Sequence, residues 1–173
     1  METPETWRDE GLAWGSHLPA LMACVAASEG PVLEFGAGNY STPCLRAVCE
    51  VLGRELVTVE KVDSWRASFE SYDCPKHRVL NLVPGLTESL AERQWGVVFV
   101  DDAAEDRHAR ASMFADKAEF MVFHDYNFDD MKPGFDAWLA ANPCNHYVYK
   151  LCGPHTLIVS KNREIPTFCP NDD

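Results

Sequence analysis

Apolar, strand-like runs alternate with helix-spaced segments along almost the whole of this 173-residue chain. Apolar and β-branched runs bounded by turn residues predict strands, and they stand at 31–36, 55–61, 77–83, 95–101 and 118–125. Amphipathic spacing predicts helices from Ser16 onward and at 41–52, 63–72, 87–94, 104–117 and 134–142. This alternation is typical of an α/β protein with a mainly parallel sheet and helices on both faces.

The last part of the chain departs from the alternation. Two strand-like runs, 146–152 and 155–161, are joined by Gly153 and Pro154, a pairing that predicts a hairpin. We therefore expect a mostly parallel seven-stranded sheet that ends in an antiparallel hairpin. The whole chain, 1–173, is expected to form a single domain, with an N-terminal helical segment at 1–29 and a tail at 163–173.

Composition limits the partners. A formal net charge of -12 argues against nucleic acid, whose binding needs clustered Lys and Arg, and leaves a small-molecule substrate as the expectation. The seven cysteines are scattered, without a CxxC pair, which favours a reducing cytoplasm. No signal peptide is seen, and no apolar run approaches the roughly 20 residues of a membrane span. A homodimer is left open.

In open parallel sheets, ligands bind beyond the carboxyl ends of the strands. At the first strand end, "EFGAGNYST" places Gly36 and Gly38 where bare backbone can approach a ligand, and a helix N-terminus follows. The alternative is a plain structural turn. No third glycine completes a dinucleotide fingerprint, and Ser41 or Thr42 is expected to cap the helix.

The second strand ends in Glu60, 22 residues after Gly38. A carboxylate at this place can accept two ribose hydroxyls; the alternative is a solvated side chain.

Polar side chains also follow the fourth and fifth strands. Asp101 and Asp102 end one, and His124, Asp125 and Asn127 end the other. Three chemistries fit: general acid–base catalysis by His124 or an Asp, divalent metal binding by Asp101, Asp125 and Asn127, and hydrogen bonding to a polar substrate. The alternative is that the carboxylates cap helices and the histidine packs on a loop.

Together these segments resemble the class I S-adenosylmethionine-dependent methyltransferases, in their small-molecule O-methyltransferase-like branch. The resemblance covers about residues 30 to 160. It rests on Glu60, on "VFVDDAAEDR" with its Arg107, on "FMVFHDYN", and on the first motif, which comprises Glu34, Gly36, Gly38, Ser41 and Thr42.

The resemblance implies a Rossmann-like fold and methyl transfer from S-adenosylmethionine to a small polar acceptor, normally a hydroxyl. It implies that Glu34 holds the cofactor's amino group, that Glu60 holds its ribose, and that Val62 or Trp65 faces its adenine. The remaining implied cofactor contacts are Gly36, Gly38, Asn39, Ser41, Thr42 and Asp101. The implied catalytic residues are Asp101, which lines the methyl-donor end, with His124 and Asp125 as candidate bases.

The sequence departs from the family at two points. Metal-using members pair the strand-5 Asp with an adjacent Asn, whereas Tyr126 intervenes here, so a divalent metal is left open and no ligands are assigned. Asp102 stands where the family usually has Gly, which favours an alternative: a non-catalytic S-adenosylmethionine-binding or regulatory module. A NAD-dependent oxidoreductase is a third hypothesis, weakened by the missing third glycine.

The segment before the first strand allows two arrangements. Trp7 and Trp14 either close over the cofactor or pack on the flank of the sheet. In the first arrangement, Ser16 and His17 lie near the mouth of the pocket.

Overall fold

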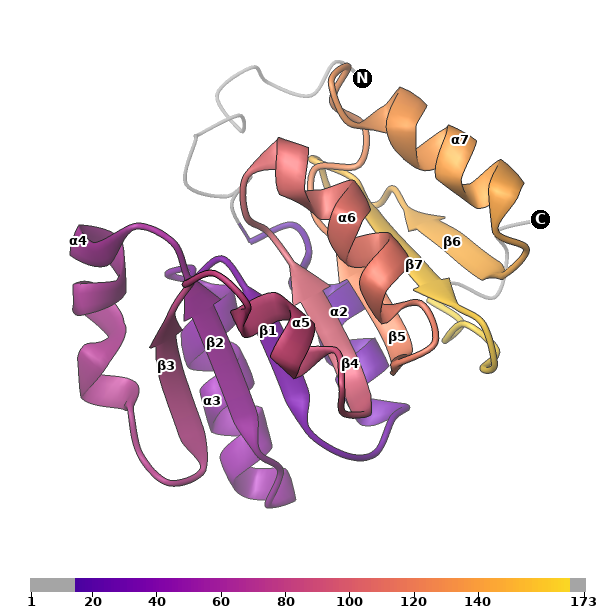
Figure 1. Ribbon diagram of the computed structural model, residues 1–173. Coiled ribbons are helices and arrows are strands. Elements are labelled where there is room, and N and C mark those ends of the chain that lie inside the picture. The colour runs from indigo at the N-terminus through magenta and orange to yellow at the C-terminus, as the bar shows by residue number, and fades with distance from the viewer. Residues whose placement is uncertain (1–14, 169–173) are drawn as a thin grey trace, which may run out of the picture.

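The computed structural model describes residues 15–168, and its centre is one seven-stranded sheet with the order β3-β2-β1-β4-β5-β7-β6 (Figure 1). Strands β1 to β5 are parallel, and β7 runs antiparallel between β5 and β6. The strand bounds are β1 Val32–Phe35, β2 Leu56–Glu60, β3 His77–Asn81, β4 Trp95–Val100, β5 Ala118–Phe123, β6 Asn145–Tyr149 and β7 Thr156–Ser160. The mostly parallel α/β sheet and its C-terminal hairpin are confirmed.

Helices cover both faces of the sheet (Figure 1). On one face, α2 (Leu18–Ala26) and α3 (Ser41–Leu52) bury Leu21 and Leu45 against the strands. On the other, α5 (Leu86–Leu90), α6 (Ala104–Phe114) and α7 (Lys132–Ala141) enclose a second core that contains Phe114 and Phe135. Strands β1 and β4, and β5 from Phe120 onward, are buried on both faces, as their near-continuous apolar sequences predict.

The helix boundaries correct several expectations. The helix predicted at 63–72 divides into a short α4 (Asp63–Arg66) and a 3₁₀ segment, η2 (Ala67–Tyr72). The predicted cap of α3 is wrong: Tyr40 occupies the N-cap position without a side-chain capping bond, and Ser41 is the first helical residue. Thr42 does not cap α3 because its hydroxyl is engaged beneath the preceding loop.

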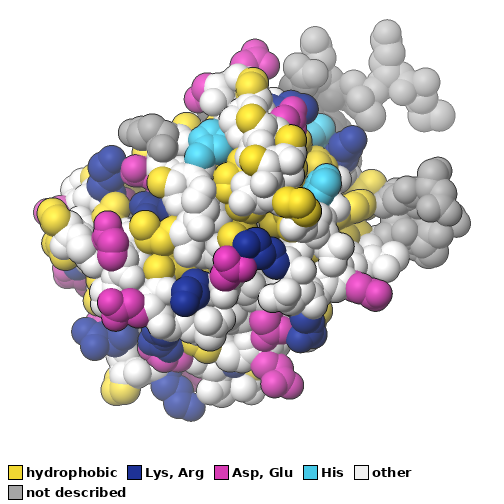
Figure 2. Space-filling model, turned by 45° about the vertical axis from the view of Figure 1, so that its right-hand side comes forward, with side chains coloured by type: hydrophobic (Ala, Val, Ile, Leu, Met, Phe, Trp, Pro, Cys, Tyr) yellow, Lys and Arg dark blue, Asp and Glu magenta, His cyan; other side chains and the backbone are white. Residues whose placement is uncertain are grey.

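Two features bear on possible partners. On the face drawn in Figure 2, Lys and Arg side chains are interspersed with Asp and Glu side chains. No helix within residues 15–168 is long and apolar enough to cross a membrane. The outer parts of the predicted N-terminal segment and tail, including Trp7 and Trp14, lie outside the described residues.

Candidate functional site

The two glycines after β1 have different structural roles. Gly36 turns the chain with φ of 87° beside the end of β4, and an added Cβ would lie 2.3 Å from the Asp101 carbonyl oxygen. This turn therefore requires glycine. At Gly38, the only contact of an added Cβ closer than 3.4 Å would be with the Ser41 hydroxyl, at 2.8 Å. This hydroxyl can rotate away at the cost of its hydrogen bond to Glu34, and no backbone atom blocks an added Cβ, so the turn itself does not demand glycine at position 38.

Glu34 lies directly beneath this loop and is 0% exposed. Its Oε2 accepts hydrogen bonds from the hydroxyls of Thr42 (2.9 Å) and Thr58 (2.7 Å), and the Thr42 oxygen accepts the Gly38 N–H at 2.9 Å. Burial raises the pKa of Glu34 to about 7, against hydrogen bonds from Ser41, Thr58 and Thr42 that lower it. The carboxyl group thus holds the loop in shape from inside the protein.

Glu60, at the end of β2, holds the same loop from its outer side. Its two carboxylate oxygens accept the backbone N–H groups of Ala37 (3.0 Å) and Val62 (2.7 Å). The Trp65 indole donates to the Ala37 carbonyl at 2.6 Å. Val62 and Trp65 are 54% and 40% exposed, so two apolar side chains stand open to solvent beside this carboxylate.

Arg107 of α6 joins the carboxylates at the ends of β4 and β5. Its Nη2 lies 3.1 Å from Asp101 Oδ1 and 3.3 Å from Asp125 Oδ2, and its guanidinium also donates to the Asp102 and His124 carbonyls. Asp125 has φ of 59°, an uncommon conformation for a residue other than glycine that is found preferentially at functional sites.

The two carboxyl groups differ in acidity. Burial acts to raise the pKa of Asp101, but the hydrogen bond with His124 and the charges of His124 and Arg107 together hold it below its ordinary value. For Asp125, burial prevails, so its pKa is raised despite the charges of His124 and Arg107. Of the pair, Asp125 is therefore the stronger base.

Two of the residues that follow these strands point elsewhere. Asp102 forms an ion pair with Arg110, with 2.5 Å between Asp102 Oδ2 and Arg110 Nη2. The Arg110 guanidinium lies over the Phe35 ring. Asn127 accepts the His155 backbone N–H with its side-chain oxygen, at 2.6 Å. The three residues considered as metal ligands therefore do not share one site. Asp101 and Asp125 pair with Arg107, whereas Asn127 binds the backbone just before β7.

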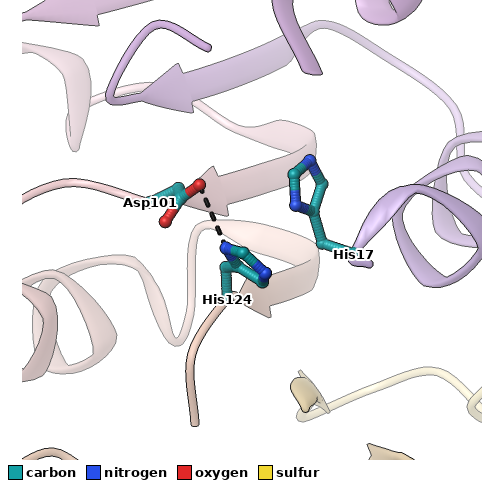
Figure 3. A group of neighbouring side chains, drawn as sticks. All are labelled: His17, Asp101 and His124. Atoms are coloured by element: carbon teal, nitrogen blue, oxygen red, sulfur yellow. Dashed lines mark hydrogen bonds and ion pairs between the residues drawn. The ribbon is translucent and has the colours of Figure 1, made fainter. Parts of the chain in front are cut away.

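His17 joins the site from the segment before α2 (Figure 3). Its ring lies 4.5 Å from the His124 ring, edge to face, and 4.7 Å from the Phe99 ring. His124 Nδ1 lies 3.2 Å from Asp101 Oδ2, and its Nε2 lies 2.8 Å from the Ser16 hydroxyl. Burial, and to a smaller extent the charge of His124, lowers the pKa of His17 to about 4, although the negative charge of Asp101 acts to raise it. His17 is therefore a neutral imidazole at pH 7.

Sequence patterns alone did not pair His17 with Asp101. The one signal was its position before the first strand, which placed Ser16 and His17 near the pocket if that segment covered the strand ends. In the structure, Ser16 and His17 both contact His124.

Comparison with solved structures shows that the chain has the fold of the class I S-adenosylmethionine-dependent methyltransferases. No family model and no curated protein matches it. One similar structure is the Podospora anserina methyltransferase PaMTH1 bound to S-adenosylhomocysteine, with TM-score 0.64, 14% identity and coverage of 86% of this chain and 78% of that one.

Two further structures show the same likeness. Human methyltransferase-like protein 13, in complex with S-adenosylhomocysteine, has TM-score 0.62 and 18% identity, with 90% of this chain and 86% of that one covered. A candidate caffeoyl-CoA O-methyltransferase from Staphylococcus aureus has TM-score 0.62 and 11% identity, with 84% and 82% covered. The predicted Rossmann-like methyltransferase fold is confirmed.

Proposed function

We propose that this protein binds S-adenosylmethionine across the carboxyl ends of β1, β2 and β4 and transfers its methyl group to a hydroxyl of a small polar acceptor. The observation that carries the proposal is the loop at 36–39, which is held from below by Glu34 and from the side by Glu60. The glycine at position 38 is not required by the turn. A preorganised loop with bare backbone suits a ligand that must lie close to the main chain. Two structures with the same fold contain S-adenosylhomocysteine.

The proposed cofactor contacts follow from exposure. Gly36, Gly38 and the exposed Asn39 face the methionine portion. Glu60 receives the ribose hydroxyls, and Val62 and Trp65 enclose the adenine ring. Glu34, Ser41 and Thr42 are buried, so we assign them to support of the loop rather than to ligand contact, which revises the roles that the family resemblance implies.

Asp101, His124 and Asp125 form the proposed catalytic end of the site. Methyl transfer requires the acceptor oxygen in line with the sulfonium, and positioning supplies much of the rate. The new O–CH₃ bond forms as the S–CH₃ bond breaks, S-adenosylhomocysteine leaves, and the hydroxyl proton passes to a base. Asp125 is the better-placed base because its pKa is raised and its side chain is 18% exposed, against 5% for His124.

One observation favours the alternative of a non-catalytic S-adenosylmethionine-binding module. Arg107 contacts both Asp101 and Asp125 and thereby competes with a substrate proton for the base. A protein that binds S-adenosylmethionine tightly and transfers no methyl group would support this alternative.

The setting proposed for the activity is a reducing, cytoplasmic one. The described cysteines are all free thiols, and disulfides are rare in that compartment.

Calorimetric titration with S-adenosylmethionine, S-adenosylhomocysteine and NAD tests the cofactor proposal. Gly38→Ala should weaken binding of the first two at least about tenfold, equivalent to about 1.4 kcal/mol. Gly53→Ala is the control for a loss of stability away from the loop: its φ of 68° strains an added side chain, its Cβ meets nothing within 4 Å, and it lies at the C-terminal end of α3. If Gly38→Ala binds these ligands as tightly as the wild type, the loop does not contact the cofactor. Binding of NAD and of neither S-adenosyl compound would favour a NAD-dependent oxidoreductase instead.

The transfer step needs its own assay. Label from methyl-tritiated S-adenosylmethionine is followed onto a panel of phenols, catechols and sugars, with Asp125→Asn as the test variant. Asn tolerates the positive φ of this position, so the variant should retain S-adenosylhomocysteine affinity and lose transfer. Undiminished transfer by Asp125→Asn would exclude this residue as the base.

A further inference from the structure

His17 is buried in an unusual state. It is 1% exposed, and neither ring nitrogen has a hydrogen-bond partner among the described residues. Buried polar groups are nearly always hydrogen-bonded, and an exception commonly marks a water molecule or an ion. The ring is fixed by its contacts with Phe99 and His124.

The hydrogen bonds of His124 define which of its nitrogens is free. The Ser16 hydroxyl donates its single proton to the Pro154 carbonyl, at 2.8 Å. It can therefore only accept from His124 Nε2, which must carry a proton. His124 Nδ1 then faces Asp101 Oδ2 at 3.2 Å and Asp125 Oδ1 at 3.4 Å. Either Nδ1 carries a second proton, or a cation lies between its lone pair and the carboxylate.

We propose that His17, Asp101 and His124 bind one divalent transition-metal ion of the zinc type. These side chains come from three separate parts of the chain and converge on one point (Figure 3). One ligand atom from each lies within 4.8 Å of the others. The 3.2 Å between His124 Nδ1 and Asp101 Oδ2 is close to the roughly 3.3–3.4 Å between two tetrahedral ligands of zinc. Imidazole nitrogens as ligands favour zinc, cobalt or nickel over magnesium or calcium.

The groups around these three side chains would orient them as ligands. His124 is fixed through Ser16 and the Pro154 carbonyl, the kind of outer contact that metal-bound histidines make. Arg107 takes Asp101 Oδ1 and leaves Oδ2 for the ion. The site shares only Asp101 with the oxygen set considered from the sequence, and it excludes Asn127, which binds the His155 backbone.

Three protein ligands leave a fourth position open, as in catalytic zinc sites. A water or an acceptor oxygen bound there would have its pKa lowered by the ion. This consequence for the acceptor rests on the proposed methyl transfer, whereas metal binding itself does not.

The test is a cobalt titration of the full chain after removal of metal with a chelator. We expect one Co²⁺ per chain with the visible d–d absorption of a four-coordinate ion, displaced by Zn²⁺. His17→Gln should weaken Co²⁺ binding at least about tenfold, and Ser16→Ala, which frees His124, about 10–100-fold. His146→Gln is the matched control, because it removes an exposed imidazole outside the site.

Each outcome decides the proposal. Equal affinity for His17→Gln and His146→Gln, no stoichiometric Co²⁺ binding, or a thiolate-to-cobalt band that places the ion on cysteine would each overturn it. Far-UV circular dichroism of the same samples confirms that the variants are folded, and their titration with S-adenosylhomocysteine separates the two proposals. A wild type that binds S-adenosylhomocysteine and no metal loses only the metal site; a wild type that binds metal and no S-adenosylhomocysteine loses only the cofactor site.

Discussion

Replacement of Gly36 by alanine tests how closely the ends of β1 and β4 approach each other. The φ of 87° is left-handed, a conformation that costs a residue with a Cβ about 1–2 kcal/mol. The new Cβ would lie 2.3 Å and 2.7 Å from the Asp101 carbonyl oxygen and carbon and 3.0 Å from the Asp102 nitrogen. These are backbone atoms of the neighbouring segment, and the Asp101 N–H bonds the Phe35 carbonyl, so they cannot move aside singly. Overpacking adds about 1–3 kcal/mol, for a total loss of about 2–5 kcal/mol.

Gly85→Ala separates the two contributions. Gly85 has φ of 83°, and an added Cβ there meets nothing within 4 Å. This variant should therefore lose only the conformational cost, about 1–2 kcal/mol. Urea unfolding, analysed by linear extrapolation, measures both. An equal loss of unfolding free energy in the two variants would refute the close approach of β1 to β4.

Three further changes probe the loop and the carboxylates. Gly38→Ala should alter the free energy of unfolding by less than about 1 kcal/mol, because the one close atom is a rotatable hydroxyl; a larger loss would show that the turn requires this glycine. The folded-state pKa of Glu34 is about 7, against an ordinary 4.5. Its contribution to the free energy of unfolding is therefore complete below pH 4.5 and is lost as the pH rises through 7. Between these limits, urea titrations should show the wild type losing on the order of 2–3 kcal/mol more than Glu34→Gln, and parallel pH profiles would contradict the raised pKa. Arg107→Gln leaves Asp101 and Asp125 without their guanidinium partner and should destabilise the protein by about 2–4 kcal/mol, measured by urea unfolding at pH 7, with the loss shrinking as the pH falls toward 3; a pH-independent loss would point to packing instead of charge.

The sheet could be predicted from the sequence because its signal is local. The central strands are short apolar runs bounded by Gly, Asp or His, and each predicted strand overlaps an observed one. The cap of α3 could not be predicted, because the choice among Tyr40, Ser41 and Thr42 depends on a contact across the fold. Thr42 serves the buried Glu34 on β1, and no sequence pattern displays that bond.

For the candidate site too, the sequence predicted the positions at the strand ends but not the contacts made across the fold. The rule that parallel strands end at one edge correctly gathers Glu60, Asp101 and Asp125 there. It does not show that Arg107 joins the two aspartates or that His17 packs on His124. Those contacts depend on how the segment before α2 and the helix α6 cross the strand ends, which packing in three dimensions decides.

A crystal structure of the protein with S-adenosylhomocysteine tests the central claim most directly. The account predicts the ligand's ribose on Glu60, its adenine between Val62 and Trp65, and its methionine portion against Gly36 and Gly38, with the sulfur directed toward Asp101. A ligand bound at another edge of the sheet, or a soaked crystal with this edge free of ligand while the titration shows binding, would contradict it.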